Sequence, residues 1–245
     1  MRRRNIVGII QARISSERLP GKVLLDLAGE PMLVREIDRL SRAKMLDKIV
    51  VATSVNPNDD KIASLCKSRE WNCFRGSEDD VLDRYYQTAQ SHRASVIVRL
   101  TADCPLIDPL IVDQVIEEFN NRQPEIDYVS NIAPKRTYPR GLDTEVFRFD
   151  VLERAWQEDK NPSSREHVTP YIRERSDLFQ SFGVINDQDF SHMRWTVDTS
   201  EDLAFVRLIY EYFDHDKFSW QDVLAAVNAH PEWSEINKDV IQKAI

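Results

Sequence analysis

Three short, mostly apolar runs constrain the fold of this chain more than any other feature. They cover residues 6–10, 49–53 and 96–100, and none has the helical spacing of apolar positions. Such runs are typical of strands that are buried on both faces of a sheet. Amphipathic segments with helical spacing, such as residues 32–40, lie between them. This alternation predicts an α/β fold with a mostly parallel sheet.

The pattern changes after residue 126. The elements expected there are strands at 127–129, 145–147 and 180–185, helices at 151–158 and 163–175, and an aperiodic stretch at 131–142. We interpret residues 130–190 as an insertion or subdomain within a single domain that spans residues 1–245. The length suits one large domain with an elaborated insertion.

Glycine is scarce, with six in 245 residues, and its positions exclude two common phosphate-binding loops. No G-x-G-x-x-G can be written, so the dinucleotide fingerprint is absent. The dipeptide Gly21-Lys22 matches the end of a P-loop motif. That motif also needs Gly at position 16 and Ser or Thr at position 23, where this chain has Ser16 and Val23. Phosphate binding would therefore have to use side chains.

Charge and cysteine usage narrow the class of partners. The formal net charge is −8, so non-specific nucleic-acid binding is not expected. Three cysteines without a C-x-x-C pair argue against a disulfide framework and favour a reducing cytoplasm. No apolar run reaches the length of a membrane span. We therefore expect a cytoplasmic protein without a membrane partner.

The loop at 11–22 follows a predicted buried strand, and its cations suit a phosphate ligand. Ligands of parallel α/β sheets bind beyond the carboxyl ends of the strands, which here points to residues 11–22, 54–59 and 101–108. The first loop carries Arg13, Arg18 and Lys22. Three loop charges are usually no more than a solvated surface. Their placement at this edge of the sheet favours phosphate binding.

Two aspartates are candidate magnesium ligands. Asp103 follows the third strand by three residues, where a carboxylate can hold Mg²⁺ facing a triphosphate. Asp198 ends a predicted short strand at 194–198, before a helix that opens at Thr199 or Ser200. For Asp198, helix capping and metal binding both remain open. Asp108, directly before a proline, is predicted to cap a helix instead.

Three segments together resemble a known family. They are Q-A-R-I-S-S-E-R-L-P-G-K-V-L at 11–24, L-T-A-D-C-P-L-I-D-P at 100–109 and W-T-V-D-T-S-E-D-L at 195–203. These are similar to SpsF-type cytidylyltransferases, a family named for a spore coat polysaccharide biosynthesis protein and related to CMP-KDO and CMP-acylneuraminate synthetases. Residues 74–85 and 138–143 extend the resemblance, which runs from residue 6 to about residue 213.

The resemblance implies a Rossmann-like nucleotidyltransferase fold of the GT-A-like type, a three-layer sandwich around a mostly parallel sheet. It implies transfer of CMP from CTP to a sugar acid, with release of pyrophosphate and with Mg²⁺ as cofactor, in surface polysaccharide biosynthesis. It also implies a homodimer that forms through the insertion at about 130–190.

The resemblance also assigns residues by position. Arg13 and Lys22 would bind the triphosphate with help from Arg18, and Asp103 and Asp198 would hold Mg²⁺. Arg13, Lys22, Asp103 and Asp198 are thus the expected catalytic residues. The remaining nucleotide-binding residues would be Gln11, Ala12, Gly76, Ser77, Asp80 and Thr101, several of them lining the cytosine and ribose pocket.

The acceptor side is expected at 138–145 and near residue 167. Arg140 could meet an acceptor carboxylate, and Asp143 or Glu145 its hydroxyls. His167 is either an acceptor-binding residue or a structural histidine of a helix. KDO enzymes carry Gln-Gly where this chain has Thr101 and Ala102, so the expected acceptor is a small acidic sugar other than KDO.

Two other functions remain as alternatives. A glycosyltransferase of similar fold would use a nucleotide sugar, but such enzymes usually carry an Asp-x-Asp motif after a strand, and residues 101–105 have none. A non-catalytic nucleotide-binding protein is the second alternative. Arg13, Lys22, Asp103 and Asp198 are all present, which argues against a decayed site.

Overall fold

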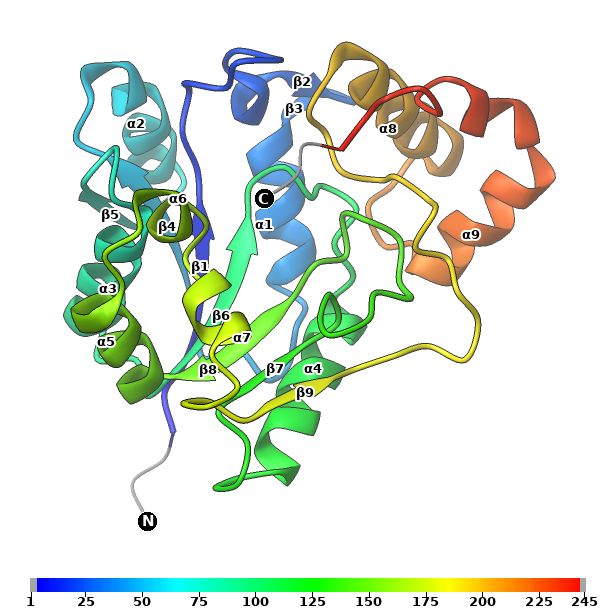
Figure 1. Ribbon diagram of the computed structural model, residues 1–245. Helices are drawn as coiled ribbons and strands as arrows, with labels where there is room; N and C mark the ends of the chain where they lie inside the picture. Colours follow the sequence, from blue (N-terminus) through cyan, green and yellow to red (C-terminus); the bar gives the residue numbers. More distant parts are fainter. Residues whose placement is uncertain (1–3, 243–245) are drawn as a thin grey trace.

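The computed structural model describes residues 4–242, which form a seven-stranded sheet with helices on both faces (Figure 1). The strand order is β5-β4-β1-β6-β8-β7-β9. The strands are β1 (Ile6–Gln11), β4 (Lys48–Ser54), β5 (Asn72–Gly76), β6 (Val96–Thr101), β7 (Tyr128–Ser130), β8 (Glu145–Arg148) and β9 (Ser181–Gly183). Among the described strands of this seven-stranded sheet, only β8 runs antiparallel to its neighbours. The predicted α/β fold with a mostly parallel sheet is confirmed.

Helices complete the outer layers. They are α1 (Met32–Leu40), α2 (Asp60–Ser68), α3 (Val81–Ser91), α4 (Pro109–Asn121), α5 (Phe149–Glu158), α6 (Pro162–His167), α7 (Pro170–Glu174), α8 (Ser200–Phe213) and α9 (Trp220–Ala229). Short 3-10 turns are η1 (Lys22–Leu24), η2 (Pro57–Asp59) and η3 (Pro231–Glu235), and β2 (Asp26–Leu27) pairs with β3 (Glu30–Pro31). No helix within residues 4–242 is both long and apolar enough to cross a membrane.

The two faces of the sheet carry separate hydrophobic cores, because side chains of a strand alternate between faces. In β1, Ile6 and Ile10 belong to one core, and Val7 and Ile9 belong to the other. The first core includes residues of α1, α2, α4, α8 and α9, and the second includes residues of α3, α5 and α7. Figure 1 shows α3 and α5 on the opposite side of the sheet from α1 and α4. The sandwich is therefore three-layered.

The segment at 130–190 extends the central sheet. It supplies β8 and β9, while α5 and α6 pack beside α3. The helix predicted over 163–175 is wrong as a single element. It breaks into α6 and α7 at Val168, whose φ of 71° lies outside the helical region.

The strand predicted at 194–198 is also wrong. Within the described residues this segment makes only one isolated bridge, between Arg140 and Arg194. It is followed by α8, whose N-cap is Thr199 and whose capping box includes Asp202. Asp108 caps α4, as predicted, by accepting a hydrogen bond from the backbone N–H of Leu110 at 2.8 Å.

Candidate active site

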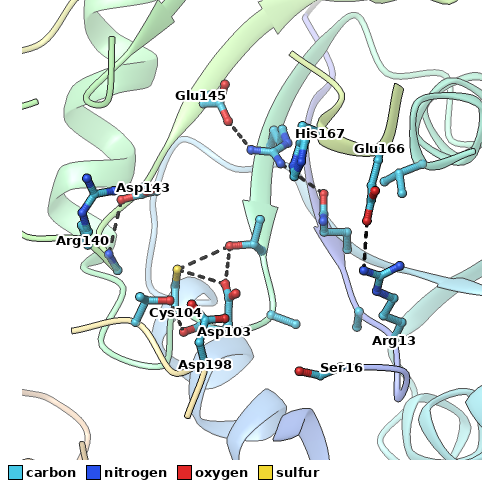
Figure 2. Close-up of a pocket in the computed structure, with 18 of the residues that line it drawn as sticks. Arg13, Ser16, Asp103, Cys104, Arg140, Asp143, Glu145, Glu166, His167 and Asp198 are labelled. Carbon is cyan, nitrogen blue, oxygen red and sulfur yellow. Dashed lines mark hydrogen bonds and ion pairs between the residues drawn. The ribbon is translucent and has the colours of Figure 1, made fainter. Parts of the chain in front are cut away.

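A cleft of about 710 Å³ opens at the carboxyl ends of β1 and β6 (Figure 2). These two strands are neighbours, with Gln11 opposite Thr101 at their ends. The cleft is lined by twelve of the residues expected from the sequence, namely Gln11, Ala12, Arg13, Arg18, Lys22, Thr101, Asp103, Arg140, Asp143, Glu145, His167 and Asp198. Segments that are far apart in the sequence thus converge on one site.

Lys22 joins the two predicted metal-binding aspartates. Its Nζ lies 3.0 Å from Oδ2 of Asp103 and 2.8 Å from Oδ1 of Asp198, and it donates to the carbonyl of Val197 at 2.8 Å. The side chain is only 11% exposed. Burial lowers the pKa of Lys22, but the two carboxylates outweigh it and hold the pKa above its ordinary value. Lys22 is therefore a fixed, fully charged ammonium.

Asp103 is an ionised carboxylate in a tight polar setting. Its Oδ1 accepts a hydrogen bond from the Thr101 hydroxyl at 2.6 Å. Burial raises the pKa of Asp103, but Lys22 and the hydrogen bond from Thr101 bring it below its usual value. The backbone carbonyl of Asp103 accepts from Thr196 Oγ1 at 3.0 Å and from the N–H of Val197 at 2.8 Å. These bonds tie the loop after β6 to the segment that carries Asp198.

Asp198 contacts three cations. Besides Lys22 on Oδ1, both Arg18 and Arg194 lie 2.8 Å from Oδ2. The helix that follows is capped by Thr199, so the capping alternative for Asp198 is wrong. Figure 2 shows Asp198 beside Asp103 in the cleft. Its metal-binding role stays a prediction.

The Asp103–Asp198 pair fits a magnesium ion as far as its donors are concerned. Magnesium in nucleotide sites is typically held by one or two carboxylates, with phosphates and water as the other ligands. No cluster of three or more His, Cys, Asp or Glu side chains suited to a metal exists in residues 4–242. Asp103 and Asp198 would thus supply two of the oxygen ligands of a magnesium ion, and the phosphates of the substrate would supply others.

The backbone of the loop after β1 is bonded to Asp59, a residue of the segment between β4 and α2. Its Oδ1 accepts from the backbone N–H of Ile14 at 2.7 Å, and its Oδ2 accepts from the hydroxyl of Ser54 at 2.5 Å. Asp59 is buried and makes no side-chain cap bond to α2. Its position in the predicted ligand-facing loop 54–59 was the available signal. At the other side of the loop, Arg13 pairs with Glu166 at 3.2 Å.

Carboxylates on the acceptor side hold arginines in place. Glu145 is 1% exposed, pairs with Arg99 and accepts from the Tyr128 hydroxyl at 2.5 Å. Asp143 binds Arg136 through two contacts of 2.5 and 2.7 Å. One or the other of these carboxylates was expected to meet acceptor hydroxyls, but the oxygens of both already carry these bonds.

Arginines therefore dominate this half of the cleft. Arg99, Arg136 and Arg173 line it, and sequence reasoning missed all three. The charge of Arg99 within an otherwise apolar strand was the signal that could have found one of them.

Gly76, Ser77 and Asp80 are not among the residues that line the cleft. Asp80 caps α3 by accepting from the N–H of Asp83 at 2.9 Å, and it pairs with Arg165 at 2.7 Å. Ser77 Oγ accepts from the N–H of Asp80 at 3.0 Å. The structure thus places these residues between the end of β5, at Gly76, and the N-cap of α3, at Asp80, and their contact with cytosine and ribose stays a prediction.

Residues near the C-terminus also reach the cleft, which the sequence did not indicate. Arg18 donates to the carbonyl of Ile241 at 3.3 Å, and Arg194 donates to Oε1 of Gln242 at 2.5 Å. Gln242 lines the cleft. Asn237 ties this C-terminal segment to the cleft, because its Nδ2 donates to the backbone carbonyl of Arg194 at 3.0 Å.

Comparison with known proteins decides the family. A family model described as cytidylyltransferase matches residues 7–219. The chain belongs to the cytidylyltransferase family. It is 31% identical over 239 residues to the spore coat polysaccharide biosynthesis protein SpsF of Bacillus subtilis, covering 93% of this chain and 96% of that protein. This confirms the resemblance and makes the protein a CTP-dependent nucleotidyltransferase.

Two further cytidylyltransferases are similar. The 3-deoxy-manno-octulosonate cytidylyltransferase of Geobacter sulfurreducens is 38% identical over 114 residues, which is 46% of this chain and 44% of that protein. The solved structure of a cytidylyltransferase from Leptospira borgpetersenii is 33% identical, with a TM-score of 0.91 over 99% of this chain and 100% of that one. The nucleotidyltransferase fold of the family thus extends over the whole described chain.

Proposed function

We propose that this cytidylyltransferase transfers CMP from CTP to a sugar acid, a 2-keto sugar acid or related small acid, and releases pyrophosphate in surface polysaccharide biosynthesis. The observation that carries the proposal is the single cleft in which Lys22, Asp103 and Asp198 meet while arginines line the acceptor side. The names of the SpsF and 3-deoxy-manno-octulosonate relatives support a sugar acid and a polysaccharide.

The chemistry needs positioning and charge more than a reactive side chain. In a transfer of this kind, an acceptor oxygen attacks the α-phosphorus in line, the bond to the β-phosphate oxygen breaks, and pyrophosphate leaves. Arg13, Arg18 and Lys22 would hold the triphosphate and stabilise the charge on the departing pyrophosphate. No protein nucleophile takes part.

Asp103 and Asp198 would hold Mg²⁺. Bound there, the ion would neutralise phosphate charge and lower the pKa of the attacking hydroxyl. The two carboxylates suit this task because both line the cleft and converge on the position of one cation, the ammonium of Lys22. Arg18 and Arg194, which pair with Asp198, hold that carboxylate in its orientation.

His167 would serve the acceptor as a neutral hydrogen-bonding group. Burial lowers its pKa, and Arg99, Arg173 and Arg13 lower it further, while Glu166 opposes them. The imidazole is therefore uncharged at neutral pH. An uncharged imidazole can accept or donate one hydrogen bond to a sugar hydroxyl.

We also propose a cytoplasmic homodimer whose contact involves residues 130–190. The proposal follows from the resemblance. A molecular mass measured in solution at micromolar protein tests it: twice the chain mass of 28.6 kDa is expected, and a monomer would contradict it.

A pyrophosphate-release screen tests the proposed function. CTP, UTP, ATP and GTP are each offered with a panel of 2-keto sugar acids and other small acids, with Mg²⁺. We expect release with CTP and at least one acid, and a loss of about 10²-fold or more in Asp103→Asn and Lys22→Met. Lys67→Met is the matched control, because Lys67 is an exposed lysine of α2 outside the cleft.

Three results would count against the proposal. The first is Asp103→Asn and Lys22→Met proteins that release pyrophosphate at the wild-type rate. The second is release of a nucleoside diphosphate from a nucleotide sugar, which would favour the glycosyltransferase alternative. The third is CTP binding without turnover across the panel, which would favour a non-catalytic nucleotide-binding protein.

A further inference from the structure

The acceptor half of the cleft contains two arginines whose charge no carboxylate neutralises through an ion pair. Four arginines line it, namely Arg99, Arg136, Arg140 and Arg173. Glu145 pairs with Arg99, and Asp143 pairs with Arg136. Within residues 4–242, the guanidinium groups of Arg140 and Arg173 make no hydrogen bond or ion pair. The four arginines and two carboxylates therefore leave an excess of two positive charges.

Arg173, near the end of α7, carries a buried polar atom without a partner. Its Nε is fully covered and makes no hydrogen bond. Arg173 lines the cleft together with Glu145 and His167, and its charge lowers the pKa of each of them. A buried guanidinium nitrogen without an acceptor is unfavourable. An anion bound beside Arg173, which lines the cleft, would stabilise the charge of this guanidinium group.

Arg140 lies among other cations. Burial lowers the pKa of Arg140, and Arg136 and Arg194 lower it further, while only Asp143 opposes them. Because Asp143 already binds Arg136 through both oxygens, it is not free to neutralise Arg140. The repulsion between these guanidinium groups favours an anion beside Arg140.

The position of Arg140 is fixed by its backbone. Its N–H donates to the carbonyl of Met193 at 3.0 Å, and its carbonyl accepts from the N–H of Trp195 at 2.8 Å. The following Gly141 has φ of 105°, and a Cβ there would lie 2.6 Å from the carbonyl carbon of Trp195. This close packing holds the turn that presents Arg140 to the cleft.

We propose that the acceptor is a small organic dianion, with one acidic group for Arg140 and a second for Arg173, rather than a sugar acid with a single carboxylate. The proposal rests on the proposed function and narrows its substrate class. The two guanidinium groups belong to different segments, because Arg140 lies in the turn whose backbone pairs with Met193 and Trp195, whereas Arg173 lies in α7. Two separate anion positions follow from this, and a single carboxylate would leave one guanidinium unpaired.

A pair of matched probes tests the charge of the acceptor. D-Gluconate and D-glucarate share a six-carbon chain and differ in having one or two carboxylates. Calorimetric titration of the full chain is expected to show glucarate binding at least about tenfold more tightly than gluconate, the effect of one additional charge-assisted contact. Arg140→Gln and Arg173→Gln should each reduce this preference to less than about threefold.

Two further variants keep the test specific. Arg175→Gln is the matched control, because Arg175 lies two residues after Arg173, has a side chain that is 43% exposed and pairs with Asp177 outside the cleft. It should leave the preference unchanged. Arg173→Lys retains the charge and should recover part of the preference that Arg173→Gln loses. Far-UV circular dichroism of each variant shows whether the fold is retained.

The inference is overturned if gluconate binds as tightly as glucarate, if neither binds, or if folded Arg140→Gln and Arg173→Gln retain the preference. CTP binding and pyrophosphate release by the wild-type chain are measured in parallel. If the proposed function is wrong, these nucleotide reactions fail. If only the proposed charge of the acceptor is wrong, CTP binding and pyrophosphate release are observed, while gluconate and glucarate bind with similar affinity.

Discussion

The buried pair of Glu145 and Arg99 gives the sharpest stability prediction. The two residues are opposite each other in the register of β8 and β6, and their side chains are 1% and 13% exposed. Glu145→Gln preserves the size of the side chain but leaves Arg99 without its carboxylate. Breaking a buried pair from one side typically costs about 3–5 kcal/mol of unfolding free energy. We expect about 3–4 kcal/mol here, because Arg99 retains some contact with solvent.

The loss should depend on pH in a defined direction. Burial raises the pKa of Glu145, but Arg99, Arg173 and hydrogen bonds from Thr169 and Tyr128 bring it below its ordinary value. A carboxyl whose pKa is depressed by folding stabilises the fold above its unfolded pKa, and this stabilisation disappears as pH falls through the folded pKa. The difference between wild type and Glu145→Gln should therefore be full above about pH 5 and shrink as the pH falls below about 4.

Urea unfolding measures this difference. Circular dichroism and tryptophan fluorescence are followed together at pH 7, 5 and 3.5, because coincident transitions justify a two-state treatment. The matched control is Glu158→Gln, which breaks an exposed pair with Arg154 in which both side chains are 42% exposed. That change should cost less than about 0.5 kcal/mol. A Glu145→Gln protein within 0.5 kcal/mol of wild type at pH 7, or a loss that grows on acidification, would refute the reasoning.

Further predictions concern the loops around the cleft. Gly141→Ala should lower the unfolding free energy by about 2–4 kcal/mol in the same urea assay, because a φ of 105° is unfavourable for alanine and the new Cβ would overlap Trp195. Gly29→Ala should lower it by only about 1 kcal/mol, because its φ of 86° is also unfavourable but a Cβ there would meet open space. Equal losses of unfolding free energy in the two variants would argue against an overlap of the new Cβ with Trp195. Asp59→Ala should weaken CTP binding by about tenfold in a titration and cost about 2–3 kcal/mol, because it removes the acceptors for Ile14 N–H and the Ser54 hydroxyl. Unchanged CTP affinity would show that Asp59 does not determine the conformation of the phosphate-binding loop.

The sheet and its ligand-binding edge could be predicted because they follow from local patterns. Continuous apolar runs are buried strands, and β1, β4 and β6 lie where the runs are. The carboxyl ends of neighbouring parallel strands necessarily meet, so the loops after β1 and β6 share a cleft. For that reason Lys22 and Asp103 could be expected near each other from position alone.

Asp198 shows what pattern alone could not decide. The residues before it resemble a strand, but the segment is extended chain that binds other groups instead of a sheet edge. Val197 uses its N–H for the carbonyl of Asp103 and its carbonyl for Lys22. Only the resemblance to cytidylyltransferases predicted that Asp198 lies near Asp103. The sequence separation of two distant segments does not determine whether they meet in the fold.

The acceptor half was the least predictable region. Arg99 lies in a buried strand, and the composition of such a strand gives no indication that Glu145 will stand opposite it in an antiparallel neighbour. Val168, with a positive φ, and Pro170 break the expected helix and set the direction of α7, which carries Arg173. Tertiary contacts, not local propensity, decide these positions.

Transfer of the α-phosphate of CTP to the acceptor is the measurement that tests the central claim most directly. CTP labelled at the α-phosphorus and CTP labelled at the γ-phosphorus are incubated separately with the wild-type chain, Mg²⁺ and an acid that supports turnover. The account predicts that the α label appears in an acceptor product while the γ label appears only in pyrophosphate, in equal amounts. Label from the γ-phosphorus in the acceptor, or release of inorganic phosphate in place of pyrophosphate, would contradict it.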